Sequence, residues 1–513
     1  MDGSHIFHTR LTAPLIHVLP IELLSEIFTI VACIARQTVA PTAWMQLLLV
    51  CKLWKRIASD IAELWRVIYV NSNQDWLRLC LARAPRCFID LHLVNVSVGD
   101  IHAAKHLILP HKDRIRALRI KDSHDRLMNN VADMFTVSLP ALEELSFVPV
   151  EWRVKRETSF ALSAQAFPWI RSLTLSGVSI PRELAFYRNL RYLELHEHCC
   201  KDNGFTIRDL FDALQTASAT LEDLDLSRFD PIVEESRPLE RPQVHLQNLR
   251  SFCMDNSFEL ASQLVKHLRI TPCTHLRLRI AISEGQALEH RTTERLLAAI
   301  VPPGIRVALD QAEDFAVLIG GGRFRVRVFD RTPSSSSPQP GDVRSERVCI
   351  ELLGPCILAE ALRAVPRICA APLTTLSITA PNVPYDVHDW RIALGAFPLL
   401  ENLAIQGWQG SWTGSIGIAF TALAREAELE LPGATSKGAA RCPSLKAVRV
   451  EGRSFGDLLE REESRRFLSI VVRCLRSREG YARKLDTLTL RSFLQNEAYV
   501  ELEGLVDKVE IAF

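Results

Sequence analysis

A short pattern of apolar and polar positions recurs along most of the chain after residue 88. An apolar residue is followed by two others, a second apolar residue, one other and a third, so each copy ends in the alternation of a strand with one buried face. The first eight copies begin 20 to 31 residues apart. The copies are Phe88-Leu91-Leu93, Ile115-Leu118-Ile120, Leu142-Leu145-Phe147, Ile170-Leu173-Leu175, Leu190-Leu193-Leu195, Leu221-Leu224-Leu226, Leu249-Phe252-Met254, Cys273-Leu276-Leu278, Leu373-Leu376-Ile378, Leu400-Leu403-Ile405, Leu445-Val448-Val450 and Leu485-Leu488-Leu490.

Helical periodicity separates several of these predicted strands. Apolar residues three or four apart predict helices that contain Ile207, Leu210, Phe211 and Leu214, and further on Phe258, Leu260, Leu264 and Leu268. Between residues 282 and 370 the pattern fades, although two stretches, Ile305-Val307-Leu309 and Phe324-Val326-Val328, are compatible with degenerate strands. Val509, Ile511 and Phe513 predict a closing strand.

The repeat resembles the leucine-rich repeat, whose period covers the observed spacing. The resemblance implies an α/β solenoid with parallel strands on its concave face and helices outside. The family's asparagine after the third apolar position is missing from nearly every copy, so the repeat is irregular. We predict a helical module at 12–70, a first solenoid part at 71–330, a flexible Pro/Ser loop at 331–345, and a second solenoid part with a C-terminal cap at 346–513.

The chain before the repeats predicts a compact set of short helices. Pro20 suits the first turn of a helix, and Leu23, Leu24, Ile27 and Phe28 follow it at helical spacing. A second apolar set continues the module, with lysine and arginine between its members: Leu47, Leu48, Val50, Cys51, Trp54, Ile57 and Ala58. Some 45 residues bury little core alone, so we expect another chain or the rest of this one to cover the remaining apolar surface.

This module resembles the F-box, through Leu19-Pro20, the helix ending in Ile27-Phe28, Val50-Cys51-Lys52-Leu53-Trp54, and Leu64-Trp65. The resemblance implies the substrate-recognition subunit of an SCF-type (cullin-RING) ubiquitin ligase, which binds a Skp-type adaptor and, through it, a cullin. A segment at 29–44 lengthens the motif, and its effect on adaptor binding stays open. The implied adaptor-binding residues are Leu19, Pro20, Leu23, Ile27, Phe28, Val50, Cys51, Trp54 and Ile57.

The residue between the second and third apolar positions of each copy is predicted to point away from the core. These residues are His92, Arg119, Ser146, Thr174, Glu194, Asp225, Cys253, Arg277, Ser377, Ala404, Arg449 and Thr489. An acidic group on this face predicts a site for a basic segment of a client protein. A glycine-rich loop with two indoles is a second candidate for client contact. The predicted client-binding residues are Glu144, Tyr192, Glu194, Asp223, Asp225, Trp408 and Trp412.

Candidate chemistry elsewhere is sparse. The segment from His196 to Cys200 has metal-ligand residue types, but not the spaced pairs of a structural zinc site, so we predict no metal and no cofactor. Gly320-Gly321-Gly322-Arg323 lacks the Lys-[Ser/Thr] of a P-loop and predicts a turn. No nucleophile-elbow, zinc-protease or catalytic-cysteine motif occurs, and we predict no enzyme.

Net charge and cysteine content limit the classes of partner and the cellular compartment that we expect. The 61 lysines and arginines nearly balance the 60 acidic residues of this 513-residue chain, which disfavours nucleic acid or a membrane surface as partner. Thirteen scattered cysteines are typical of a reducing compartment, so we expect a cytoplasmic or nuclear protein. The alternative to a ligase subunit is a scaffold protein that uses the solenoid for another assembly, and the sequence does not separate the two.

Overall fold

The computed structural model describes residues 19–36, 42–94, 96–122, 137–149, 162–196, 204–232, 243–271, 275–283, 285–286, 293–320, 323–329, 346–354, 361–369, 373–379, 385–407, 415–424, 441–452, 458–479, 482–491 and 499–512. The chain divides into two units, Met1–Leu190 and Arg191–Phe513. That division lies inside the predicted 71–330 segment, and the predicted loop at 331–345 lies outside the described residues.

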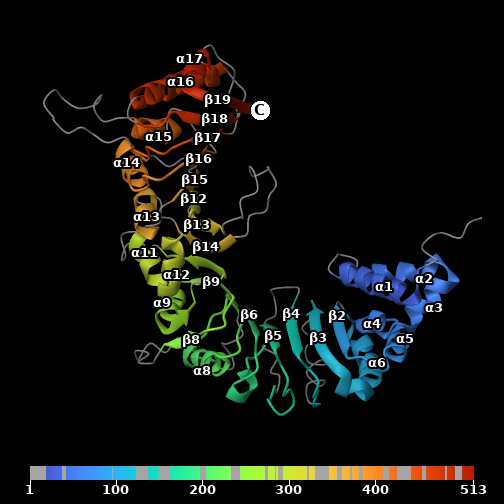
Figure 1. Ribbon diagram of the computed structural model, residues 1–513. Coiled ribbons are helices and arrows are strands. Elements are labelled where there is room, and N and C mark those ends of the chain that lie inside the picture. Colours follow the sequence, from blue (N-terminus) through green and yellow to red (C-terminus); the bar gives the residue numbers. More distant parts are fainter. Residues whose placement is uncertain are drawn as a thin grey trace, which may run out of the picture. The chain divides into compact units, whose positions relative to one another are not determined.

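The first unit begins with helices and continues as a sheet with further helices (Figure 1). Its described elements are α1 (Ile21–Arg36), the 3₁₀ helix η2 (Ala43–Gln46), α2 (Leu47–Val50), α3 (Lys52–Asp60), α4 (Ala62–Trp65), β1 (Val67–Val70), α5 (Gln74–Arg83), β2 (Ile89–Val94), α6 (Val98–Ile108), η3 (Leu109–Arg114), β3 (Ile115–Asp122), β4 (Glu144–Pro149), β5 (Ser172–Ser176) and η5 (Leu184–Tyr187).

Local sequence explains where the first helices begin and break. α1 starts directly after Pro20, whose carbonyl accepts the first helical bond from the Leu24 amide at 3.1 Å. The second predicted apolar set forms two helices because Cys51 is extended (φ −160°, ψ 170°) and separates α2 from α3. Its Sγ accepts the Trp54 amide at 3.4 Å and so caps α3.

Strands β1 to β5 form a parallel sheet in which each strand pairs with the next along the chain. The register aligns one apolar row across all five strands, and its members are 0 to 1% exposed: Ile68, Leu91, Leu118, Leu145 and Leu173. This row is the continuous core that a stack of strand units buries.

The second unit repeats strand and helix. Its described elements are β6 (Tyr192–His196), α8 (Ile207–Ala217), β7 (Asp223–Ser227), β8 (Val244–Leu246), β9 (Ser251–Ser257), α9 (Phe258–His267), β10 (Leu268–Ile270), β11 (His275–Ala281), α11 (Thr293–Ile300), α12 (Pro303–Asp310), β12 (Asp314–Gly320), β13 (Arg323–Phe329), β14 (Glu346–Leu353), α13 (Ala361–Ile368), β15 (Thr375–Thr379), α14 (Val387–Gly395), β16 (Asn402–Gly407), α15 (Ser415–Leu423), β17 (Ala447–Gly452), α16 (Leu458–Arg478), β18 (Leu485–Arg491), α17 (Tyr499–Leu505) and β19 (Val506–Ala512).

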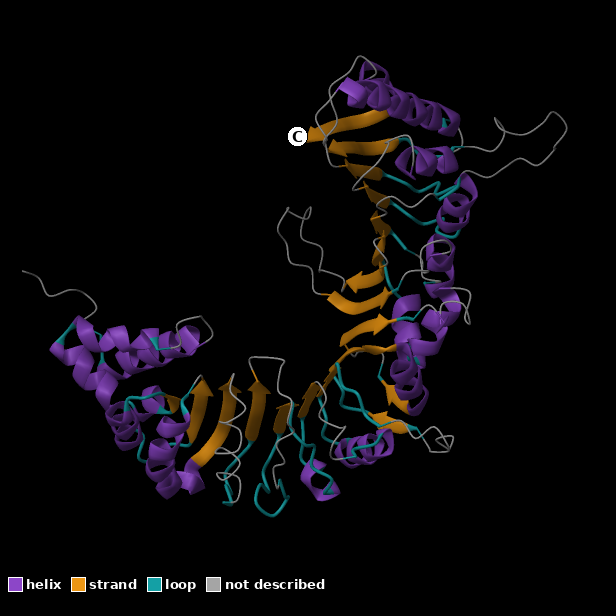
Figure 2. Cartoon of the chain, turned by 180° about the vertical axis from the view of Figure 1, so that it is seen from behind, coloured by secondary structure: helices purple, strands orange, loops and turns teal. Residues whose placement is uncertain are grey.

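The sheet of the second unit is mostly parallel, in the order β6-β7-β9-β11-β14-β13-β12-β15-β16-β17-β18-β19. Only β13 runs against its two neighbours, so β12, β13 and β14 form an antiparallel insertion between parallel strands. β8 and β10 pair separately. Helices α9, α11 and α13 to α15 lie along one side of this sheet (Figure 2), and the other side is called the polar face below.

The predicted strands are confirmed: each of the twelve copies places its second and third apolar residues in a strand. Two details of the prediction were wrong. Phe88 is 56% exposed and Ile89, 0% exposed, takes its place in the core. Ile305, Val307 and Leu309 lie in helix α12, where Ile305 and Leu309 are buried four residues apart and Val307 is 45% exposed. The chain is therefore an α/β protein with a mostly parallel sheet, an architecture consistent with a solenoid.

Other predicted elements have mixed outcomes. α8 contains its four predicted residues, but the helix predicted from Phe258 to Leu268 ends at His267, and Leu268 begins β10. Phe324, Val326 and Val328 do form a strand, β13, although an antiparallel one. β19 is the predicted closing strand and pairs in parallel with β18. No described helix has the length and apolar character needed to cross a membrane.

Candidate functional site

Helix α1 exposes a line of apolar side chains along one face. Leu23, Ile27, Ile30 and Ile34 follow one another at intervals of four, three and four residues, which places them on one side of a helix, and we call them the apolar stripe. Their exposed fractions are 47, 38, 52 and 59%. Contiguous exposed apolar surface is typical of sites that contact another protein, a ligand or a membrane.

The opposite face of α1 anchors it to the other helices. Leu24, Phe28, Ala32 and Ala35 are buried, and the Phe28 ring packs on Trp54 with centroids 4.8 Å apart. The helix is therefore apolar on two faces, one used for folding and one left open. Helical spacing in the sequence suggests a single apolar face for Leu23, Leu24, Ile27 and Phe28, but the structure divides them between these two faces.

The predicted adaptor-binding residues are correspondingly split by exposure. Pro20, Leu23, Ile27 and Val50 are exposed, Leu19, Cys51 and Trp54 are half-buried, and Phe28 and Ile57 are in the core. Ile30 and Ile34 were missed because they lie in the segment at 29–44 that was treated as an insert. That segment continues α1 as far as Arg36, and the three-and-four spacing of apolar residues beyond Phe28 was the available signal.

A second set of contacts ties these helices to one another next to the first strand of the sheet. The Arg36 guanidinium at the end of α1 donates to the carbonyls of Glu63 and Leu64, both at 3.1 Å. Trp65 donates from Nε1 to the Ala58 carbonyl at 2.9 Å. Because the chain passes from α4 through Arg66 directly into β1, the helical module and the first strand of the sheet are continuous.

Buried Asp90 strengthens this junction. Its carboxylate, on β2, accepts from Arg116 Nε at 3.0 Å and lies 3.4 Å from Arg66 Nε. Asp90 is only 5% exposed, so removing both positive charges would leave a costly unpaired anion. The module bearing the apolar stripe is thus held firmly on β1 and β2.

The residues predicted for client contact that the structure describes lie in strands, on the side away from the buried apolar rows. All twelve residues between the second and third apolar positions lie in strands, and of these only Thr174 is buried. Glu144 lies in the first unit, where a two-point contact with Arg119 neutralises it; the Oε2 atom is 2.7 Å from the guanidinium. Tyr192, Glu194, Asp223 and Asp225 lie in the second unit on adjacent strands β6 and β7. Trp408 and Trp412 lie outside the described residues.

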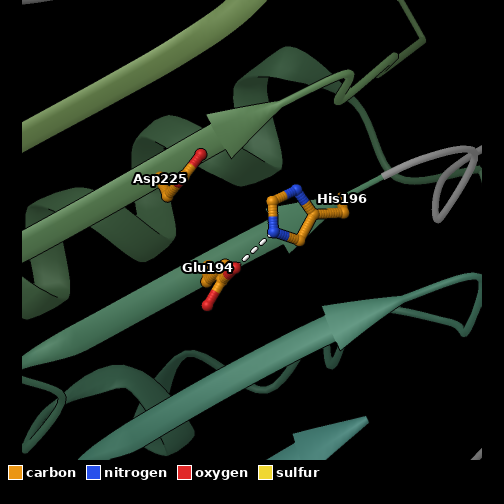
Figure 3. A group of neighbouring side chains, drawn as sticks. All are labelled: Glu194, His196 and Asp225. Atoms are coloured by element: carbon orange, nitrogen blue, oxygen red, sulfur yellow. Dashed lines mark hydrogen bonds and ion pairs between the residues drawn. The ribbon is translucent and has the colours of Figure 1, made fainter. Parts of the chain in front are cut away.

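Glu194, His196 and Asp225 converge on this face (Figure 3). Glu194 and Asp225 are directly opposite in the β6–β7 register, and His196 is two residues beyond Glu194 on the same side. His196 Nε2 hydrogen-bonds with Glu194 Oε1, and its Nδ1 lies 3.2 Å from the Ser227 carbonyl oxygen. The Tyr192 hydroxyl donates to Glu194 Oε2 at 2.6 Å.

Electrostatics favour a charged imidazole in this cluster. Burial lowers the pKa of His196, but the hydrogen bond and charge of Glu194, with the charge of Asp225, outweigh it, so the pKa is raised above 6.5. Once protonated, both ring N–H groups donate, one to Glu194 and one to the Ser227 carbonyl. Burial also raises the pKa of Asp225, against the opposing hydrogen bond from Ser227.

The donor types of the cluster are ones that divalent transition metals accept. One ligand atom from each of Glu194, His196 and Asp225 lies within 4.8 Å of the others. His196 and Glu194 satisfy each other in the ion pair, and the Ser227 amide and hydroxyl donate to Asp225. Of the predicted His196–Cys200 metal-like segment, only His196 is among the described residues, and sequence reasoning missed its partner on β7 because it considered neighbours in the chain, not across the sheet.

Comparison with known proteins finds one family that part of the chain resembles. A model of the F-box-like family matches residues 16–71, a range that covers α1 to β1 and the whole apolar stripe. A search among curated proteins returns no significant match. F-box domains bind Skp-type adaptors, and F-box proteins are generally substrate adaptors, not enzymes. The chain carries an F-box-like domain at residues 16–71, which suggests an adaptor role in an SCF-type complex.

Proposed function

We propose that this protein is the substrate-recognition subunit of an SCF-type ubiquitin ligase. The F-box-like domain binds a Skp-type adaptor and through it a cullin, while the strand repeats, as an irregular leucine-rich-repeat solenoid, hold a client protein. The observation that carries the proposal is the open apolar stripe within the matched family segment. Catalysis in this proposal belongs to the partners, and the predicted cytoplasmic or nuclear location stays a prediction.

The apolar stripe suits the adaptor because it offers apolar area without disturbing the fold. Its four side chains are 38 to 59% exposed, so covering them removes apolar surface from water at about 25 cal/mol per Å². Leu49 and Val50 of α2, 85 and 55% exposed, provide further apolar surface in the same module. The buried face of α1 and the Asp90 junction hold the stripe rigid, which lowers the entropic cost of association.

The polar face suits the client because it is made of side chains that the fold does not need. β6 and β7 alternate between core and polar face along their whole length, and β9 does so as far as Asp255, so polar-face residues there can vary without damage to the core. Residues that discriminate between partners are charged or hydrogen-bonding groups of this kind.

Co-purification with a Skp-type adaptor tests the proposal. A double variant, Leu23→Lys with Ile27→Lys, places two charges on the stripe while keeping residues that favour helix. We expect loss of adaptor binding, at least about 100-fold, with an unchanged melting temperature. Val500→Lys is the matched control, because Val500 is 75% exposed on α17 and lies outside the matched segment.

Two results would contradict the proposal. Wild-type protein that fails to bind any Skp-type adaptor would remove the ligase role and favour a scaffold. Adaptor binding that survives the double variant would show that the apolar stripe is not the contact surface.

A further inference from the structure

The polar face of the second unit is divided into two zones of opposite charge. Strands β6, β7 and β9 contain four carboxylates and no lysine or arginine: Glu194, Asp223, Asp225 and Asp255. The next three strands in the sheet, β11, β14 and β13, contain six arginines against two glutamates: Arg277, Arg279, Arg323, Arg325, Arg327 and Arg347 against Glu346 and Glu351. The second zone carries a net charge of +4, and the first carries −4 with His196 neutral and −3 with His196 protonated, the form that its carboxylate neighbours favour.

Ion pairs among residues of one row of the register join the two zones where they meet. Arg279 lies 3.5 Å from Asp255 and 3.8 Å from Glu351, and Arg325 lies 2.7 Å from Glu351. These four side chains neutralise one another. The unbalanced positive charge therefore lies in other rows.

The adjacent row leaves two arginines for a partner. It runs Asp225, Cys253, Arg277, Cys349 and Arg327 across five neighbouring strands. Arg277 is exposed and forms no ion pair with a described residue, and Arg327 lies over the Phe329 ring at 5.6 Å. They flank the small Cys349 side chain and are two strands apart, roughly 10 Å.

Neither zone is explained by the fold. The core beneath them is apolar and fully buried, with Leu224, Leu278, Ile350 and Val326 at 0 to 1% exposure. In the acidic zone Glu194 and Asp225 lie directly opposite each other, and like charges in that arrangement destabilise a sheet. A partner with the complementary pattern would offset the net charge of each zone.

We propose that this face binds an extended client segment that carries a cluster of Lys or Arg and, about four residues away, a cluster of Asp or Glu. The distance follows from the sheet: β7 and β14 are three strands apart, roughly 14 Å, and an extended chain advances about 3.4 Å per residue. The basic cluster lies on β6 and β7 and the acidic cluster on β11, β14 and β13. This inference rests on the proposed client-binding role of the repeats and adds the chemistry of the client.

Labelled synthetic peptides titrated with the full-length protein test the proposal by fluorescence anisotropy. The probe has three lysines, one neutral residue and three glutamates, which puts the centres of the two clusters four residues apart, and the reference peptide has the same composition with alternating charges. We expect the segregated peptide to bind about tenfold more tightly, since only it can satisfy both zones at once. Equal binding of the two peptides would overturn the proposal.

Two protein variants assign each half of the peptide. The double variant Arg277→Gln with Arg327→Gln should abolish the contribution of the glutamate half of the peptide to binding. The double variant Asp223→Asn with Asp225→Asn should abolish the contribution of the lysine half. Arg306→Gln, an exposed position on α12, is the control and should change neither. Sedimentation of the protein alone completes the test, because self-association lost in the variants would show that the divided face meets a second copy and not a client.

A failure of the proposed client chemistry is distinguishable from a failure of the proposed function. Adaptor co-purification is measured on the same samples. Peptides without preference, on a protein that still binds the adaptor, would remove only the client chemistry.

Discussion

The apolar stripe and the charged polar face are two surfaces of contrasting chemistry. The stripe is a single helix face of four aliphatic side chains, 38 to 59% exposed, within the segment that matches a known family. The polar face of the second unit has side chains of both signs, sorted into zones by strand. Apolar burial gives affinity with little direction, whereas arranged charges give selectivity and speed of encounter. In the proposed function, an apolar surface suits an adaptor that is the same in every complex, whereas a charged surface suits a client that must be selected.

The largest effect we expect concerns the two faces of one strand. Leu224 of β7 is 1% exposed, and Asp225 beside it is on the polar face. Leu224→Asp buries a carboxylate without a partner and should lower the free energy of unfolding by about 4 kcal/mol or more, disrupting neighbouring strands. Thermal unfolding measures it. Asp225→Asn is the matched control and should leave the melting temperature within a few degrees; near-wild-type unfolding of Leu224→Asp would contradict the assignment of the core.

Sequence predicted this distinction between faces better than it predicted the strand order. Alternation places a residue on the core or the polar side with no tertiary information, which is why all twelve copies have their second and third apolar residues in strands. The insertion of β12 to β14 was not predicted, because antiparallel pairing at β13 follows from contacts between strands and not from the repeat. In α12, the spacing of Ile305, Val307 and Leu309 fits in part both the two-residue period of a strand and the 3.6-residue period of a helix. Only packing decides between a strand and a helix here.

The candidate sites show the same limit. The acidic residues of β6 and β7 were predicted because each lies at a fixed place in the repeat. Arg327, the second arginine beside Cys349, was not predicted, since it comes from the antiparallel strand β13 and lies in the same row as Arg277 through the β14 register. Ile30 and Ile34 were also missed, although their spacing was visible in the sequence.

A smaller effect is the difference in salt dependence between binding at the polar face and binding at the apolar stripe. Raising the ionic strength from 0.05 to 0.3 M shortens the screening length from roughly 14 to 6 Å, so exposed charge pairs weaken. We expect binding of the segregated-charge peptide to weaken about tenfold and binding of the adaptor to change less than about twofold. Titrations of one preparation at both salt concentrations measure this. If adaptor binding proved the more salt-sensitive of the two, the contrast drawn between the surfaces would be wrong.

The smallest expected effect distinguishes two histidines by opposite pH dependence. Burial, with the charge of Arg119, lowers the pKa of His92 on β2 to about 4, whereas His196 on β6 has a raised pKa. For His92 the unfolded chain binds the proton more tightly, so its contribution to stability is present above pH 6.5 and is lost as the pH falls toward 4. For His196 the folded chain binds the proton more tightly, so its contribution is present below pH 6.5 and is lost as the pH rises through its raised pKa.

Free energies of unfolding between pH 4 and 8 measure the two slopes in variants that replace each histidine by glutamine. His92→Gln should remove a loss of stability on the acid side, and His196→Gln should remove a loss near and above neutrality. Because His196 lies between Glu194 and Asp225, the second variant also leaves the acidic zone more negative and should strengthen the lysine half of the peptide interaction. Parallel slopes in the two variants would mean that the imidazole of His196 is not held as a cation by its carboxylate neighbours.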